Sequence, residues 1–135
     1  MIEVWDTSAL ILAARDRTVA TGLGEALAND EVAISEPVLL EYLNGARNVA
    51  EYERFDETLR AVRLLSTTPD DWRRALVVHR MLAESGPGHQ RSVRLVDLIV
   101  AAVAERHGYP IAHVDRDYER IAGLTGQPTR LVASP

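Results

Sequence analysis

The sequence predicts an α/β fold in which a parallel sheet of about five short strands is flanked by helices. Short runs of apolar residues alternate with longer helical segments along the chain, which is typical of this class. In addition, Asp6 and Asp115 directly follow two of these apolar runs, 2–5 and 111–114. The carboxyl ends of parallel strands meet at one edge of a sheet, where ligands bind. Because the chain has no linker or repeat, we expect residues 1–135 to form a single domain.

The first half of the chain is expected to hold three strands. The first strand covers residues 2–6, and the helix over residues 8–14 would be capped by Thr7 or Ser8. Ser35-Glu36-Pro37 predicts another helix, because it combines a helix-capping residue, Ser35, with a proline in the first turn. The remaining elements expected here are a helix at 18–28, a strand at 32–34, an end to the proline-led helix at Asn44-Gly45, a helix at 50–62 and a strand at 62–65.

The second half is expected to hold the last two strands. The segment 95–104 is apolar on nearly every side, and a helix of that kind is buried. It should end at Gly108-Tyr109-Pro110, and the stretch 85–91 reads as a loop because it contains Gly-Pro-Gly. The other elements expected here are a helix at 70–84 that starts near Pro69, a strand at 111–114, a helix at 118–124 and a strand at 130–132.

The composition excludes several classes of protein. The absence of cysteine excludes disulfides and thiolate zinc sites, and it favours a cytoplasmic location. No apolar run reaches the roughly 20 residues of a membrane helix. Because the first strand begins at once, we expect no signal peptide. All 15 basic residues are arginine, so the phosphate-binding lysine of P-loop enzymes and Schiff-base chemistry are excluded as well.

The net charge of −5 at first argues against a polyanionic substrate such as RNA. The sequence nevertheless offers five acidic residues that could form one site: Asp6, Glu41, Asp97, Asp115 and Asp117. The other acidic residues would then number about the same as the 15 arginines. Clustered carboxylates repel one another unless a divalent cation neutralises them, and such a cation also attracts phosphate.

Asp97 is the most informative of these five residues. It lies in an apolar helix, and burial of an isolated carboxylate costs several kcal/mol, so it needs a partner. Arg91 and Arg94 are the nearest arginines in the sequence that could pair with it. One interpretation is a first-turn aspartate favoured by the helix dipole, and the other is a metal ligand.

Each of the other four acidic residues also has an interpretation without a metal. Glu41 could lie on the outer face of a surface helix, and Asp6 could cap the helix that follows it. Asp115 could belong to a tight turn, and Asp117 could be the N-cap of a helix that begins at Tyr118. A cap would still present a carboxylate near the strand ends, so the two interpretations are compatible.

Four motifs in this order resemble the PIN-domain ribonucleases, and especially the VapC-type toxins of toxin–antitoxin pairs. They span most of the chain and read Asp6-Thr7-Ser8-Ala9-Leu10, Glu36-Pro37-Val38-Leu39-Leu40-Glu41, Val96-Asp97-Leu98-Ile99-Val100-Ala101-Ala102 and His113-Val114-Asp115-Arg116-Asp117-Tyr118. Two positions depart from the family pattern. His113 stands where many relatives have threonine or serine, which could alter a hydrogen bond near Asp115, and Tyr118 replaces a frequent phenylalanine.

The resemblance implies a PIN-like three-layer sandwich with strand order 3-2-1-4-5. It also implies a Mg²⁺ or Mn²⁺ ion held chiefly by Asp6 and Asp97, with Asp115 and Asp117 nearby and Glu41 orienting water. Members of the family cut RNA endonucleolytically, often transfer RNA, and many are homodimers. Each is silenced by a cognate antitoxin that occludes the acidic pocket.

Several further expectations follow from the residues around these motifs. His89, Arg91 and Arg94 border the Gly-Pro-Gly loop and are candidates for RNA phosphate contacts, although they could also belong to a polar loop. Ser8 is expected to cap a helix or to hydrogen-bond to Asp6. Asp70 should lie at a helix start away from the site.

Two other functions compete with a ribonuclease. One is a non-catalytic PIN-like module that binds RNA or protein, which the complete acidic set disfavours. The other is phosphoryl transfer to aspartate, as in receiver domains and haloacid-dehalogenase-like phosphatases. Both of those classes use a lysine, which this chain lacks, and the phosphatases need an aspartate where Ser8 stands.

Overall fold

The computed structural model describes residues 1–133 and contains one parallel sheet with strand order β3-β2-β1-β4-β5. The strands are β1 Glu3–Trp5, β2 Val32–Ser35, β3 Arg63–Leu65, β4 Ile111–His113 and β5 Thr129–Leu131. At the centre of the sheet, Val4 lies opposite Ala33 on one side and opposite Ile111 on the other. The expected strand order is confirmed, and it places the strands that precede Asp6 and Asp115 side by side.

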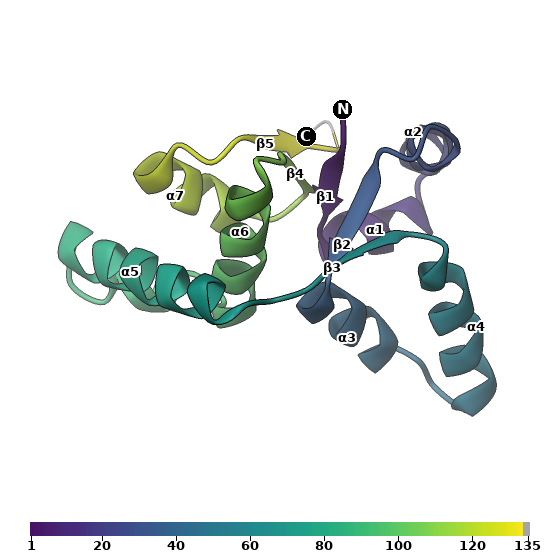
Figure 1. Ribbon diagram of the computed structural model, residues 1–135, viewed down its shortest axis with the longest axis horizontal. Helices are drawn as coiled ribbons and strands as arrows, with labels where there is room; N and C mark the ends of the chain where they lie inside the picture. Colours follow the sequence, from purple (N-terminus) through teal and green to yellow (C-terminus); the bar gives the residue numbers. More distant parts are fainter. Residues whose placement is uncertain (134–135) are drawn as a thin grey trace.

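Helices cover both faces of this sheet. Figure 1 shows α5, α6 and α7 on one side of the strands and α1, α2 and α4 on the other, which confirms the three-layer α/β sandwich. The helices are α1 Thr7–Ala13, α2 Arg17–Ala28, α3 Glu36–Asn44, α4 Val49–Arg60, α5 Pro69–Ser85, the 3₁₀ helix η1 His89–Ser92, α6 Leu95–His107 and α7 Arg116–Thr125. Within residues 1–133, no helix has the length and apolar character that a membrane span requires.

The core lies between the central strands and α6. Val4, Ala33 and Ile111 are fully buried, as expected for parallel strands covered on both faces. In α6 every residue from Asp97 to Ala104 is buried, which confirms that its apolar character marks an internal helix. The carboxylate of Asp97 therefore enters the core at the point where α6 begins.

The ends of several elements differ from the expected ones. The N-cap of α1 is Asp6 rather than Thr7 or Ser8, because the carboxylate of Asp6 accepts a hydrogen bond from the backbone N–H of Ser8. The N-cap of α7 is Asp115, so this helix begins at Arg116 and Asp117 lies inside its first turn. Here the expected start at Tyr118 was wrong.

The stretch expected to be a loop contains a short helix. The 3₁₀ helix η1 follows Gly88, whose φ of 74° lies in the left-handed region that glycine adopts without steric cost. The Gly-Pro-Gly pattern did not predict this short helix, because the same residues also favour irregular structure. As a result His89 and Arg91 have helical backbone geometry.

Asp71 connects the start of α5 to the end of α6. Its side chain is only 2% exposed and forms a capping box with Thr68. It also accepts hydrogen bonds from Arg106 Nε at 2.9 Å and Arg106 Nη2 at 3.1 Å. The same Arg106 Nη2 donates to the carbonyl oxygen of Ser66 at 2.9 Å, so one arginine fixes the entry into α5.

We expect Asp71→Ala to lower the free energy of unfolding by about 2–4 kcal/mol, the sum of a lost helix cap and lost charged hydrogen bonds. Asp70→Ala is the matched control, because the neighbouring Asp70 side chain is 81% exposed and forms a surface ion pair with Arg73. That variant should cost less than about 1 kcal/mol. Urea denaturation measures both values, and equal losses would show that Asp71 has no special structural role.

Candidate metal centre

The carboxyl edge of the sheet gathers the acidic side chains. Asp6 follows β1, and its backbone N–H donates to the carbonyl oxygen of Ala112 in the neighbouring β4 at 3.0 Å. Asp115 lies two residues beyond the end of β4, and Asp117 follows in the first turn of α7. Asp97 reaches the same edge from the first turn of α6. Residues far apart in the sequence therefore meet because two neighbouring parallel strands end at the same place.

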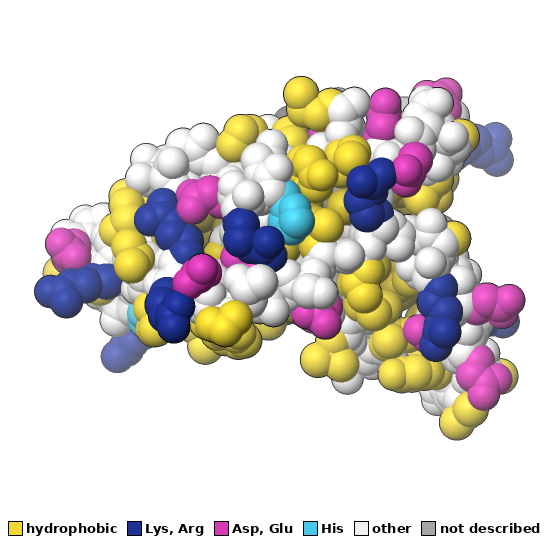
Figure 2. All heavy atoms as spheres, viewed as in Figure 1, with side chains coloured by type: hydrophobic (Ala, Val, Ile, Leu, Met, Phe, Trp, Pro, Cys, Tyr) yellow, Lys and Arg dark blue, Asp and Glu magenta, His cyan; other side chains and the backbone are white. Residues whose placement is uncertain are grey.

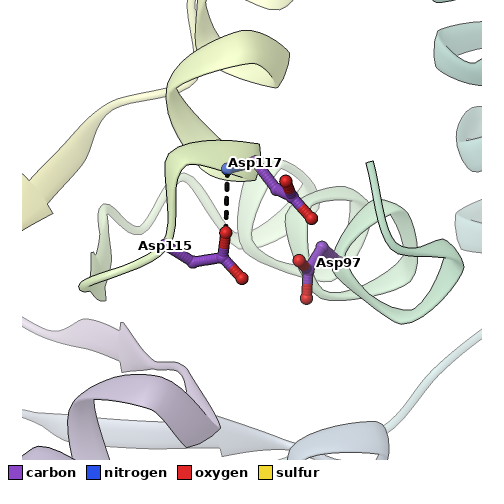
Figure 3. A group of neighbouring side chains, drawn as sticks. All are labelled: Asp97, Asp115 and Asp117. Carbon is purple, nitrogen blue, oxygen red and sulfur yellow. Dashed lines mark hydrogen bonds between the residues drawn. The ribbon is translucent and has the colours of Figure 1, made fainter. Parts of the chain in front are cut away.

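Asp97, Asp115 and Asp117 form a compact acidic group. One carboxylate oxygen from each lies within 4.8 Å of the others, and Figure 3 shows the three side chains turned toward a common space. Asp115 Oδ1 accepts a hydrogen bond from the backbone N–H of Asp117 at 3.0 Å, drawn as the dashed line. Asp97 Oδ2 is buried and has no hydrogen-bond partner among the described residues. A buried oxygen without a partner and three converging carboxylates are suited to a hard divalent cation.

Asp6 adjoins this group but has other partners. Its Oδ2 accepts hydrogen bonds from Ser8 N at 3.0 Å and Ser8 Oγ at 2.6 Å, which confirms the expected contact with Ser8. Its Oδ1 accepts from the hydroxyl of Tyr118 at 2.6 Å, and that hydroxyl lies 3.2 Å from Asp97 Oδ1. Asp6 and Asp97 thus converge on one phenol, although both oxygens of Asp6 are already hydrogen-bonded.

Two buried side chains of the acidic centre, Asp97 and Tyr118, have raised pKa values. Burial, the contact with Asp117 and the charges of Asp6 and Asp115 together raise the pKa of Asp97 to about 8. Burial and the charges of Asp6 and Asp97 also raise the pKa of Tyr118 well above its usual value, so its hydroxyl keeps its hydrogen at neutral pH. Asp97 without a metal therefore retains a proton that a cation would have to displace.

Glu41 reaches the acidic group from α3. Thr7 Oγ1 donates to Glu41 Oε1 at 3.0 Å, and Arg94 pairs with Glu41 Oε2. The backbone N–H of Arg94 donates to Asp117 Oδ2 at 2.8 Å. Arg94 therefore bridges Glu41 and Asp117. Arg94, one of the two arginines that could have paired with Asp97, pairs with Glu41, and Asp97 accepts its hydrogen bond from Tyr118.

His113 and Ser8 fix the backbone around the centre. Burial lowers the pKa of His113, and its neutral ring accepts a hydrogen bond at Nδ1 from the backbone N–H of Asp115 at 3.1 Å. Ser8 Oγ accepts from Val114 N at 3.2 Å while donating to Asp6. The unusual histidine thus hydrogen-bonds to the backbone of Asp115 without occupying the space between the carboxylates.

The three residues suggested for RNA contacts are placed differently. Arg94 lies at the acidic group, with a side chain that is 59% exposed. His89 and Arg91 belong to η1, where the Nδ1 atom of His89 is 3.1 Å from Ser85 Oγ. Among the described contacts, neither joins the acidic group. Figure 2 shows arginine and acidic side chains intermixed on the face that it presents.

Sequence reasoning missed Tyr118 and Thr7 as parts of this centre. The sequence identifies Tyr118 only as a substitute for a frequent phenylalanine, yet its side chain is completely buried and its hydroxyl contacts two of the carboxylates. A buried tyrosine usually finds a partner for its hydroxyl, and this was the available signal. Thr7 offered no signal beyond its position after Asp6.

Comparisons with known proteins agree with this geometry. Residues 4–124 match the family described as PIN domain. Ribonuclease VapC18 of Mycobacterium tuberculosis is 36% identical over 98% of this chain and 96% of its own length. Ribonuclease VapC21 of the same species is 40% identical over 71% of this chain and 69% of its own length.

Solved structures share the fold at lower sequence identity. A toxin–antitoxin complex from Klebsiella pneumoniae contains a chain with a TM-score of 0.75 and 19% identity, covering 98% of this chain and 99% of that one. VapBC-5 from Mycobacterium tuberculosis, of the VapBC family of toxin–antitoxin systems, gives a TM-score of 0.67 and 26% identity, covering 95% and 96%. The chain therefore belongs to the PIN-domain family and, within it, to the VapC proteins.

Proposed function

We propose that this protein is a metal-dependent endoribonuclease and the toxin of a toxin–antitoxin pair. The observation that carries the proposal is the group formed by Asp97, Asp115 and Asp117, in which the buried Asp97 Oδ2 has no hydrogen-bond partner among the described residues. The relatives named as ribonucleases support RNA as the substrate. Transfer RNA is the substrate class that the resemblance to VapC toxins implies. In this proposal, residues 1–135 form a single domain.

In this proposal, Asp97, Asp115 and Asp117 hold Mg²⁺, and Asp6 completes the metal site from the side of β1. Mn²⁺ would substitute, because both ions accept carboxylate oxygens. The chemistry that such an ion supplies is activation of water and stabilisation of negative charge on the phosphate. The five acidic residues would then have two roles. The four aspartates would bind the ion, and Glu41, whose side chain is 19% exposed, would orient water beside it.

The test is cleavage of RNA by the purified protein, followed by sequencing of the new RNA ends. We expect cuts at a small number of positions in transfer RNA, which require Mg²⁺ and stop when EDTA removes it. Cleavage that persists in EDTA, or no cleavage of any cellular RNA, would contradict the proposal. In the second case, calorimetry without Mn²⁺ or Mg²⁺ binding would favour a non-catalytic module that binds RNA or protein.

A cognate antitoxin is the proposed protein partner, in the cytoplasm. Two neighbouring cavities support this, because both are lined by Ala14 and Tyr42 and the smaller one, about 260 Å³, also borders Glu41. The larger cavity, about 430 Å³, lies among α1, α2 and α4 and is mostly apolar. An antitoxin segment that filled both would end beside the acidic group. Solved complexes of toxins with antitoxins in this fold are consistent with such a partner.

We also propose a homodimer, formed through the face of α5 and α6. Trp72, Leu76 and Leu95 are 58%, 68% and 68% exposed, and they line a cavity of about 210 Å³. Large apolar side chains gathered in this way mark a protein contact surface. We expect Leu76→Glu to convert a dimer into a monomer in light scattering, whereas Leu40→Glu, at an equally exposed residue of α3, should leave the dimer intact. A wild-type monomer would contradict this part of the proposal.

A further inference from the structure

Tyr118 lies between Asp6 and Asp97, two carboxylates that different elements bring to the acidic centre. Its side chain is completely buried, and its hydroxyl lies 2.6 Å from Asp6 Oδ1 and 3.2 Å from Asp97 Oδ1. Asp6 comes from the end of β1, whereas Asp97 comes from α6. One phenol therefore contacts two carboxylates that are 91 residues apart in the sequence.

The hydroxyl has a single hydrogen, which it shares between Asp6 Oδ1 and Asp97 Oδ1, and the shorter of the two hydrogen bonds is the one to Asp6. This bond keeps Asp6 Oδ1 directed toward Tyr118 while Ser8 holds Oδ2. On its other side, the phenol oxygen meets Asp97 Oδ1, which leaves Asp97 Oδ2 as the oxygen without a partner. The hydroxyl thus engages one oxygen of each carboxylate, and of these four carboxylate oxygens only Asp97 Oδ2 has no hydrogen-bond partner among the described residues.

The position of Tyr118 is itself well fixed. Its ring packs against the ring of His113, with centroids 5.2 Å apart and planes inclined by 52°. It lies in the first turn of α7, the same turn that carries Asp117 and is capped by Asp115. A single turn therefore supplies two of the carboxylates and also holds the other two through one hydroxyl.

We propose that Tyr118 is a positioning residue of the metal centre, whose hydroxyl sets the orientation of Asp6 and Asp97 toward a divalent cation. This inference rests on the proposed metal-dependent function. Four carboxylates that repel one another would otherwise turn apart, and an ion would have to reorder them as it bound. Groups that orient metal ligands without touching the metal typically change its affinity by about 10- to 100-fold.

The test is the affinity of Tyr118→Phe for Mn²⁺, measured by calorimetry on protein that circular dichroism shows to be folded. We expect the dissociation constant to rise about tenfold or more, because phenylalanine keeps the ring but loses the hydroxyl. Ribonuclease activity at low Mg²⁺ should fall and then recover as Mg²⁺ is raised. Tyr109→Phe is the matched control, since Tyr109 stacks on His107 at the far end of α6 and should bind Mn²⁺ like the wild type.

The outcomes separate this inference from the function on which it rests. Unchanged Mn²⁺ affinity in Tyr118→Phe would overturn the inference and leave the metal site intact, even if the variant melts at a lower temperature. Tighter binding would also overturn it, because the hydroxyl would then be a competitor for the carboxylates. Absence of Mn²⁺ binding to the wild type would overturn the metal-dependent function and the positioning role together.

Discussion

Asp97→Asn is expected to reduce Mg²⁺-dependent RNA cleavage more than about 100-fold, beyond the usual cost of losing an outer-shell partner of a metal. The side chain is completely buried at the start of α6, and its Oδ2 has no hydrogen-bond partner among the described residues. One of its carboxylate oxygens lies within 4.8 Å of an oxygen of Asp115 and of Asp117. Asparagine has almost the same shape but removes one negative charge and replaces one oxygen with a nitrogen that cannot bind Mg²⁺. The fold should persist, because asparagine has almost the same shape and, like the protonated Asp97 of the metal-free protein, carries no charge.

The control for this prediction is Asp70→Asn. Asp70 lies in the first turn of α5, as expected from the sequence, and its exposed side chain pairs with Arg73. That variant should cleave RNA at the wild-type rate. Rates of cleavage of a labelled RNA at saturating Mg²⁺ give the comparison, and an active Asp97→Asn protein would exclude Asp97 from the metal site.

The second large effect that we expect is a dependence of folding stability on pH, caused by the proton on Asp97. Because the pKa of Asp97 is raised to about 8, the folded protein without metal retains a proton there that the unfolded chain loses near pH 4. The folded state thus binds more protons between these values, so its stability should fall as pH rises from about 4 to about 8. The slope approaches about 1.4 kcal/mol per pH unit at most.

Binding of Mg²⁺ should displace this proton. We expect release of about one proton per ion at pH 7 and an affinity that rises up to about tenfold per pH unit until about pH 8. Calorimetry in two buffers with different heats of ionisation measures the release, and identical heats in both would contradict it. Urea denaturation across the same pH range should show a smaller pH dependence in Asp97→Asn than in the wild type.

The fold was predictable from the sequence because its determinants are local or periodic. The central strands are short apolar runs, and α6 is apolar on all sides, so the sequence of each element predicts that it is buried. The strand order came from the family resemblance. Helix ends were less certain, because Asp6, Thr7 and Ser8 are all good caps and only the three-dimensional path selects Asp6.

The candidate site was predictable only in part, for a related reason. The aspartates could be named because each follows a strand or interrupts an apolar helix. The partner of Glu41 could not be identified, because Arg94 is close to Asp97 in the sequence yet its side chain reaches α3. The role of Tyr118 depends on a hydroxyl placed between residues of two other elements, and spacing along the chain carries no information about that contact.

The ion pair between Arg94 and Glu41 places the positive charge of a guanidinium beside the acidic centre. A guanidinium can exchange one oxyanion for another with little change in its hydrogen bonding. An incoming phosphodiester could therefore take the place of the glutamate, which would become free to accept a hydrogen bond from the attacking nucleophile. Substrate arrival and liberation of a general base would then be one event, triggered by the negative charge of the nucleic acid itself.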